Sequence, residues 1–203
     1  MPPNDLELSQ KIQRIRDVLS QLTSDMGAIT ARSPDDEHGL LACQEAIAAV
    51  EEGNYGVGCV LIDPRGEVIA KARNQVFYPY FRSAGHAEMI LMDAFENCFR
   101  DIVCLKHFTL LCTLEPCPMC ISRLINSRIG TVKYVAMDDG GGMAAHLDRL
   151  PTSFRNLSRP QRFAQANASS LMREVAKEIF LLNIDCMRQR LFQRLPSDDD
   201  NTV

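Results

Sequence analysis

Three residues, His86, Cys117 and Cys120, carry the nitrogen and sulfur donors that most often bind Zn²⁺ in proteins. The two cysteines form a C-x-x-C pair, and the histidine opens an H-x-E sequence about thirty residues upstream. Three protein ligands leave one position of a tetrahedral zinc ion open for water. Glu88 lies two residues from the histidine, close enough to exchange protons with that water without being a ligand. The spacing predicts a catalytic site with one zinc ion per chain.

Both parts of this motif are expected at the starts of helices, because each follows a predicted strand or loop. Free backbone N–H groups and the helix dipole favour negative charge there, so they lower the pKa of a cysteine thiol. Cys117 and Cys120 would then bind the metal as thiolates, while His86 arrives from a neighbouring helix. A structural zinc site is the alternative. It needs a fourth ligand, such as His107 or Cys112, and leaves the nearby carboxylate without a function.

The predicted site suits the hydrolytic removal of an amino group from an aromatic ring. Zinc brings the pKa of a bound water from 15.7 towards about 7, so hydroxide becomes available at neutral pH. Glu88 can take the proton of that water and return it to a ring nitrogen and then to departing ammonia. We therefore predict an enzyme, a hydrolase that converts an amino-purine or amino-pyrimidine to the oxo form.

Two segments around these residues resemble those of the cytidine deaminase-like superfamily. They are Gly85-His-Ala-Glu88 and Thr113-Leu-Glu-Pro-Cys-Pro-Met-Cys120, which together contain the H-x-E…P-C-x-x-C signature of zinc deaminases. The similarity covers most of residues 36–195. It is greatest to the branch that holds the tRNA adenosine deaminases and the guanine and cytosine deaminases.

The resemblance implies a role for each residue of the motif. The zinc ligands and the catalytic proton shuttle that it implies are His86, Cys117, Cys120 and Glu88. It also implies that Asn74 and the backbone N–H of Ala87 contact the substrate base, although Asn74 by itself is equally consistent with a turn residue. Members of this family associate, so a homodimer is expected.

The sequence departs from the tRNA adenosine deaminases near the site. Ser83-Ala84-Gly85 stands where those enzymes have Pro-Thr-Ala, and Gly56 replaces a proline of the family. We therefore expect a free base, nucleoside or nucleotide as the small-molecule substrate. The alternative is an adenosine in tRNA or another nucleic acid, which would become inosine. A second alternative, a non-catalytic zinc-binding partner subunit, is disfavoured because Glu88 is present.

The charge of the chain is unevenly distributed. The formal net charge is −4 and the isoelectric point about 5.6, which argues against a general polyanion binder. Residues 149–194 nevertheless contain nine basic and three acidic residues. A solvated helical face is one interpretation of this stretch. An RNA-binding surface that includes Arg188, Arg190 and Arg194 is the other.

The composition, 46% hydrophobic and 24% charged, is typical of a globular protein. No apolar run has the length of a membrane span, and the first residues lack the features of a signal peptide. We expect a cytoplasmic protein that does not bind membranes. The six cysteines outside the C-x-x-C pair lie mostly among apolar neighbours and are expected to be core thiols rather than disulfides.

Apolar periodicity and turn residues predict an order of helix, helix, hairpin, helix, strand, helix, strand and helix. The strands are expected at residues 57–62, 67–73, 108–113 and 131–136, and a long final helix at residues 171–195. This order indicates an α/β fold of three layers, α/β/α, with a mixed central sheet. We expect an N-terminal helical extension at residues 1–32, a deaminase domain at 33–195 and a disordered acidic tail at 196–203.

Overall fold

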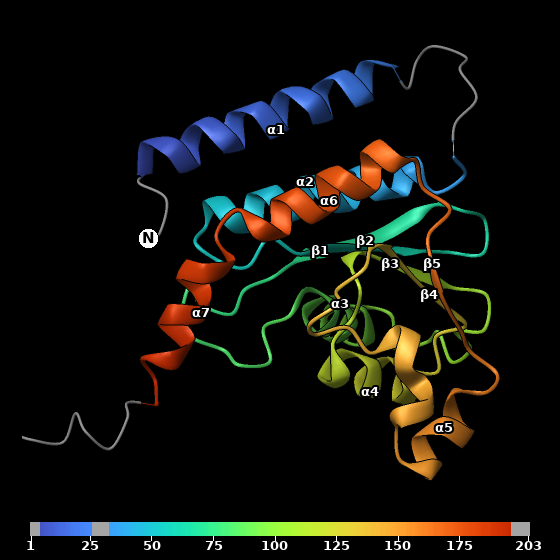
Figure 1. The fold of residues 1–203 in the computed structure, drawn as a ribbon. Helices are drawn as coiled ribbons and strands as arrows, with labels where there is room; N and C mark the ends of the chain where they lie inside the picture. Colours follow the sequence, from blue (N-terminus) through green and yellow to red (C-terminus); the bar gives the residue numbers. More distant parts are fainter. Residues whose placement is uncertain (1–4, 26–32, 196–203) are drawn as a thin grey trace, which may run out of the picture.

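A five-stranded mixed sheet forms the centre of the protein, which a computed structural model describes at residues 5–25 and 33–195 (Figure 1). The strand order is β2-β1-β3-β4-β5. The strands are β1 (Gly58–Ile62), β2 (Val68–Arg73), β3 (Thr109–Leu114), β4 (Thr131–Ala136) and β5 (Arg162–Gln165). β1 pairs antiparallel with β2 and β3, whereas β3, β4 and β5 run parallel. All of β1 is buried, as a strand between two layers of helices requires.

Helices cover both faces of the sheet, so the predicted three-layer α/β/α fold is confirmed. α2 (Asp36–Glu51) and α6 (Ser170–Leu181) pack on one face, and α3 (Ala87–Cys98) and α4 (Pro118–Ser127) on the other (Figure 1). The shorter helices are η1 (Ala144–Arg149), α5 (Thr152–Ser158) and α7 (Ile184–Phe192). Within the described ranges, none of the helices combines the length and apolar character needed to cross a lipid bilayer.

The first helix, α1 (Asp5–Asp25), lies outside α2 and α6 (Figure 1). Its apolar stripe faces the domain, and Ile15 and Leu19 are only 1% and 4% exposed. Arg16 forms an ion pair with Glu51 of α2 at 2.6 Å. α1 therefore contributes side chains to the main hydrophobic core. Residues 26–32, between α1 and α2, and the predicted tail at 196–203 lie outside the described residues.

Ser33 and Pro34 together are typical of a helix start, but α2 begins with a different N-cap residue. Asp35 occupies the N-cap position, but its side chain makes no capping hydrogen bond. One of its carboxylate oxygens accepts the N–H of Asn167 at 2.7 Å, and the other accepts Lys133 Nζ at 2.7 Å. These contacts tie α2 to β4 and to the segment before α6. The local capping preference is overridden by contacts with residues far along the chain.

The single helix predicted over residues 171–195 is wrong, because the chain forms α6 and α7 there. The break occurs at Asn183, which has non-helical backbone angles of φ −134° and ψ 10°. Asn183 is buried, and its Nδ2 donates to the backbone carbonyl of Asn54 at 2.7 Å. Periodicity could not reveal this bond to a residue far along the chain. The short, half-exposed strand β5 was also not predicted.

The end of α6 packs directly on the backbone of Gly56. A Cβ atom at this position would lie 2.4 Å from the carbonyl oxygen of Ile179, closer than real Cβ atoms approach. The segment before β1 therefore accommodates the C-terminal helices only because residue 56 has no side chain. This contact accounts for glycine where the resembled family has proline.

Replacing Gly56 by alanine should lower the free energy of unfolding by about 1–3 kcal/mol, the usual cost of overpacking. The new Cβ would meet a backbone carbonyl that cannot rotate away. Urea unfolding of the variant and the wild type measures the difference. Gly140→Ala is the control, since its Cβ would meet only an Asp138 oxygen at 3.9 Å. Equal stability of Gly56→Ala and wild type would contradict this packing.

Candidate active site

The candidate site lies at one edge of the sheet, where β2, β3 and β4 end. Asn74 follows β2, Glu115 follows β3, and Asp138 comes two residues after β4. β2 and β3 both pair antiparallel with β1, so they run in the same direction and end at the same edge. Ligands of open α/β sheets bind outside the carboxyl ends of the strands. The fold therefore collects the predicted residues at the position where a ligand is expected.

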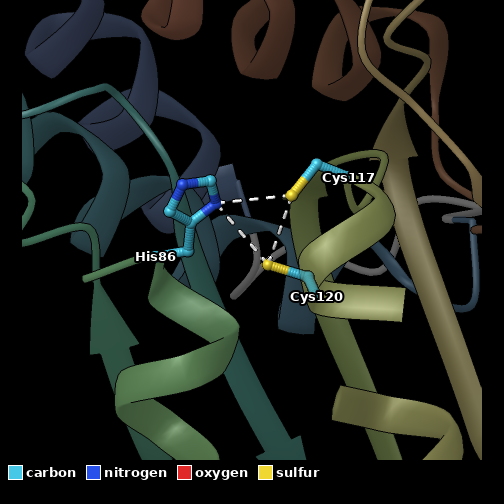
Figure 2. Close-up of side chains that lie close together, drawn as sticks. All are labelled: His86, Cys117 and Cys120. Atoms are coloured by element: carbon cyan, nitrogen blue, oxygen red, sulfur yellow. Dashed lines mark hydrogen bonds between the residues drawn. The ribbon is translucent and has the colours of Figure 1, made fainter. Parts of the chain in front are cut away.

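His86, Cys117 and Cys120 form a compact triangle of donor atoms (Figure 2). His86 Nδ1 lies 3.6 Å from Cys117 Sγ and 3.5 Å from Cys120 Sγ, and the two sulfurs lie 3.7 Å apart. Tetrahedral zinc, with bonds of about 2.3 Å to sulfur and about 2.0–2.1 Å to nitrogen, would separate the sulfurs by roughly 3.8 Å and each sulfur from the nitrogen by roughly 3.6 Å. The donor set therefore fits a zinc ion.

The starts of two helices present these donors, as the sequence predicts. His86 is the N-cap residue of α3 and Cys117 that of α4, and neither side chain caps its helix. A hydrogen bond from Cys120, and further contacts with His86, lower the pKa of Cys117 to about 4. The resulting thiolate in turn raises the pKa of Cys120. A cation that replaces the shared proton would allow both sulfurs to be ionised.

Glu88 lies in the first turn of α3 and is 3% exposed. Burial raises the pKa of its carboxyl group, and the neighbouring Cys117 raises it further. Its carboxylate does not belong to the group of donor atoms that could hold the metal, although it lines the same pocket. This position suits a proton carrier rather than a ligand.

A pocket of about 550 Å³ opens over the donor triangle. His86, Glu88 and Cys117 contribute to its floor, and much of the remaining wall is apolar. Its volume falls in the range of about 300–1,000 Å³ that is common for small-molecule sites. The pocket can therefore hold a base together with its sugar.

Asn74 is 2% exposed and lines this pocket. Its amide oxygen accepts the N–H of Val76 at 3.0 Å, which orients the amide NH₂ as the group left to donate. The loop that follows closes on itself, since the N–H of Gln75 donates to the carbonyl of Gly85 at 2.7 Å. A Cβ at Gly85 would lie 2.5 Å from the Gln75 carbonyl oxygen. The loop closure thus explains the glycine directly before the motif.

Ala87 is fully buried as the first residue of α3. A helix leaves the N–H groups of its first residues without an intrahelical acceptor. The position is consistent with a backbone donor near the donor triangle, although the side chain of Ala87 does not line the pocket.

Glu115 is a buried residue of the site that the sequence did not single out. One carboxylate oxygen accepts the N–H of Ala145 at 2.8 Å, and the other accepts that of Asp138 at 3.3 Å. A Cβ at Gly142 would lie 2.3 Å from this carboxylate. Glu115 therefore fixes the glycine-rich loop after β4 against the pocket. Its position two residues before Cys117 is the sequence feature that could have indicated a role in the site.

The alternative of a closed structural zinc site receives no support among the described residues. Neither His107 nor Cys112 joins the donor group. Cys112 lies fully buried in β3 and pairs with Cys59 on the neighbouring strand β1. Among the described residues the donor group therefore offers three protein ligands, the number typical of an open catalytic zinc site.

The three arginines predicted as an RNA surface divide into two kinds. The Arg190 guanidinium lies over the Phe77 ring at 4.3 Å and donates to the Gly53 carbonyl at 3.0 Å. The Arg194 guanidinium lies over the Phe81 ring at 3.6 Å. These two contacts fix α7 to the loop after β2. Arg188 instead lines the pocket.

Comparison with known proteins agrees with this geometry. The family model described as the cytidine and deoxycytidylate deaminase zinc-binding region matches residues 33–136. The chain belongs to this family. It is therefore a zinc-dependent deaminase, which confirms the predicted reaction class and cofactor.

Relatives of this deaminase include named enzymes. The tRNA-specific adenosine deaminase of Aquifex aeolicus is 34% identical over 143 residues, which are 68% of this chain and 91% of that protein. The tRNA-specific adenosine deaminase of Bacillus subtilis is 40% identical over 110 residues, 54% of this chain and 66% of that protein. A structure titled as guanine deaminase from Nitrosomonas europaea has a TM-score of 0.56 at 18% identity and covers 74% of this chain and 86% of that one, which shows the same fold.

Replacing Cys117 or Cys120 by alanine should abolish zinc binding, because two ligands cannot retain the ion as three do. Elemental analysis of the purified variants measures the metal, with about one zinc per chain expected for the wild type. The melting temperature should fall together with the zinc content. Cys98→Ala is the control, since Cys98 is an exposed thiol on α3. Full zinc content in both site variants would refute the assigned ligands.

Proposed function

We propose that the protein hydrolyses the exocyclic C–N bond of an amino-purine or amino-pyrimidine and releases ammonia. The observation that carries this proposal is a buried carboxylate, Glu88, in the same pocket as a donor triangle of zinc dimensions. His86, Cys117 and Cys120 would hold the metal. A bound zinc ion supplies Lewis-acid activation of a water molecule at neutral pH.

Glu88 would move the protons of the reaction. Its carboxylate accepts a proton from the attacking water and delivers it to a ring nitrogen, while the water oxygen forms a bond to the amino-bearing carbon. The remaining hydroxyl proton then passes through Glu88 to the amino group, the C–N bond breaks and ammonia leaves. Burial supports this role, because a raised pKa brings the carboxyl group closer to the range in which it can both accept and return a proton.

Asn74 and the backbone N–H of Ala87 would position the base. The Asn74 oxygen is already bonded to Val76, so the amide NH₂ is the group that can donate to a ring acceptor. Apolar wall residues, among them Val57 and Leu114, would contact the faces of the ring. A base held in this way would have its amino-bearing carbon near Glu88 and the donor triangle.

The substrate is a free base, nucleoside or nucleotide in our main proposal, which the volume and largely apolar lining of the pocket support. Adenosine in tRNA is a second candidate, because two relatives are named tRNA-specific adenosine deaminases. Ammonia release from a panel of bases, nucleosides, nucleotides and tRNA separates the two. Turnover of RNA should fall steeply with added salt, since phosphate contacts release counterions. We also expect a homodimer, which light scattering tests.

Glu88→Gln should retain zinc and the fold but lose activity by about 10²–10⁴-fold or more. The amide has nearly the same size, but it cannot carry a proton between water and the leaving amine. Steady-state assays on the identified substrate and zinc analysis provide the measurements. Glu174→Gln, at an exposed position on α6, is the matched control. A Glu88→Gln enzyme with more than about a tenth of wild-type activity is incompatible with the proposed role.

Asn74→Asp should lower kcat/KM roughly fivefold or more, since a lost hydrogen bond is worth on the order of 1 kcal/mol. The new carboxylate can still accept the Val76 N–H, so the loop should keep its conformation, while the donor towards the base is lost. Asn74→Ala removes both functions and should also reduce stability. If Asn74→Asp has wild-type kcat/KM, Asn74 serves only the turn.

A further inference from the structure

The face of α7 towards the pocket is apolar except for one arginine. Ile184, Arg188 and Leu191 line the pocket together with Phe180 and Phe192. Their spacing of four and three residues places the first three along one side of the helix. Arg188, an exposed residue, is therefore the one charged member of the side of α7 that lines the pocket.

The neighbouring arginines hold this wall in place. Arg190 and Arg194 stack on Phe77 and Phe81, and residues two apart on a helix do not face the same way. The buried Asn183 bond to Asn54 fixes the start of the same helix. α7 is thus held to neighbouring loops near both of its ends. The backbone of Arg188 is therefore fixed relative to these loops.

Arg188 has no partner that would occupy its charge. Within the described part of the chain it forms no ion pair or hydrogen bond. The pocket carboxylates have other roles: Glu115 accepts two backbone N–H groups, and Asp138 accepts the N–H of Gly140 at 3.3 Å. Glu88 lies at the donor triangle. An arginine side chain that lines a pocket and has no protein partner is available to bind an anion.

We propose that Arg188 is a specificity-determining residue that binds a phosphate group of the substrate while the base lies at Glu88. The inference rests on the proposed deaminase function and adds the chemical class of the substrate, a phosphorylated nucleoside. Guanidinium groups match phosphate oxygens with two parallel hydrogen bonds. A pocket of about 550 Å³ has room for base, sugar and phosphate.

Two sources can supply such a phosphate. A nucleoside 5′-monophosphate brings a terminal phosphomonoester, and an RNA chain brings a phosphodiester next to the reacting nucleotide. The chemistry of recognition is the same in both. Binding measurements with each ligand therefore distinguish the two sources of phosphate, whereas mutation of Arg188 alone does not.

Arg188→Gln tests the proposal by equilibrium binding. Each ligand is titrated by calorimetry into zinc-loaded Glu88→Gln protein, with and without Arg188→Gln, so that turnover cannot interfere. The ligands are adenosine, guanosine and cytidine, their 5′-monophosphates, and a short RNA hairpin with an unpaired adenosine. Arg188→Gln should weaken binding of the phosphorylated ligand roughly 10- to 100-fold and leave nucleoside binding within about twofold. The affected ligand, monophosphate or hairpin, identifies the source.

Arg159→Gln is the matched control, because it removes one exposed positive charge after α5, outside the residues that line the pocket. It should change none of these affinities. Arg188→Lys keeps the charge without the planar fork and should fall between wild type and Arg188→Gln. Equal weakening of nucleoside and phosphorylated ligands by Arg188→Gln, or no weakening of either, would overturn the proposal. So would equal binding of both ligand types in protein that contains Arg188.

The same variants separate this proposal from the deaminase function. Ammonia release by the protein with Glu88 intact tests the reaction itself. Selective binding through Arg188 without ammonia release from any ligand would refute the proposed function and leave phosphate recognition standing. Ammonia release with no dependence on Arg188 would refute phosphate recognition and leave the deaminase function standing.

Discussion

The site depends on one constraint, the close approach of two helix starts to each other at the edge of the sheet. The donor atoms of His86 and Cys117 come from different helices and must lie within 3.6 Å. α3 and α4 pack on the same face of the sheet. α3 follows strand β2 and α4 follows strand β3, and both strands end beside the site. α4 begins shortly after the buried strand β3, whereas α3 follows β2 through the loop at residues 74–86, which the hydrogen bond from Gln75 to Gly85 closes. The geometry of the metal site therefore depends on both the sheet and this loop closure.

The part of this arrangement that could be predicted from the sequence is the part that local chemistry encodes. The H-x-E and C-x-x-C spacings identify the donors and the proton carrier, and Pro118 marks the start of α4. Strand β4 is predicted with its observed bounds because an apolar run and a glycine delimit it. These signals lie within a few residues of the elements that they define.

The features that escaped prediction rest on contacts between residues far apart in the chain. Asp35 binds the segment before α6 instead of capping α2, and Asn183 breaks a helix whose apolar pattern continues through the break. Arg190 and Arg194 pack over aromatic rings that lie more than a hundred residues earlier in the sequence, so the sequence pattern did not reveal these contacts. The composition of this segment gives its charge, but it does not show which arginine side chains pack against other residues.

The groups that would react with the substrate and the groups that surround the pocket entrance belong to different parts of the molecule. The donor triangle and Glu88 belong to helix starts anchored in the sheet, whereas the pocket mouth is built from the loop after β2 and from α7. Two glycines near the motif serve this second part. Gly85 closes the loop and Gly56 admits the end of α6, and in both cases a Cβ would meet a backbone carbonyl. Gly85 and Gly56 therefore act on the pocket entrance through backbone packing, whereas separate elements hold the donor triangle and Glu88, so a change of the entrance need not alter the reacting groups.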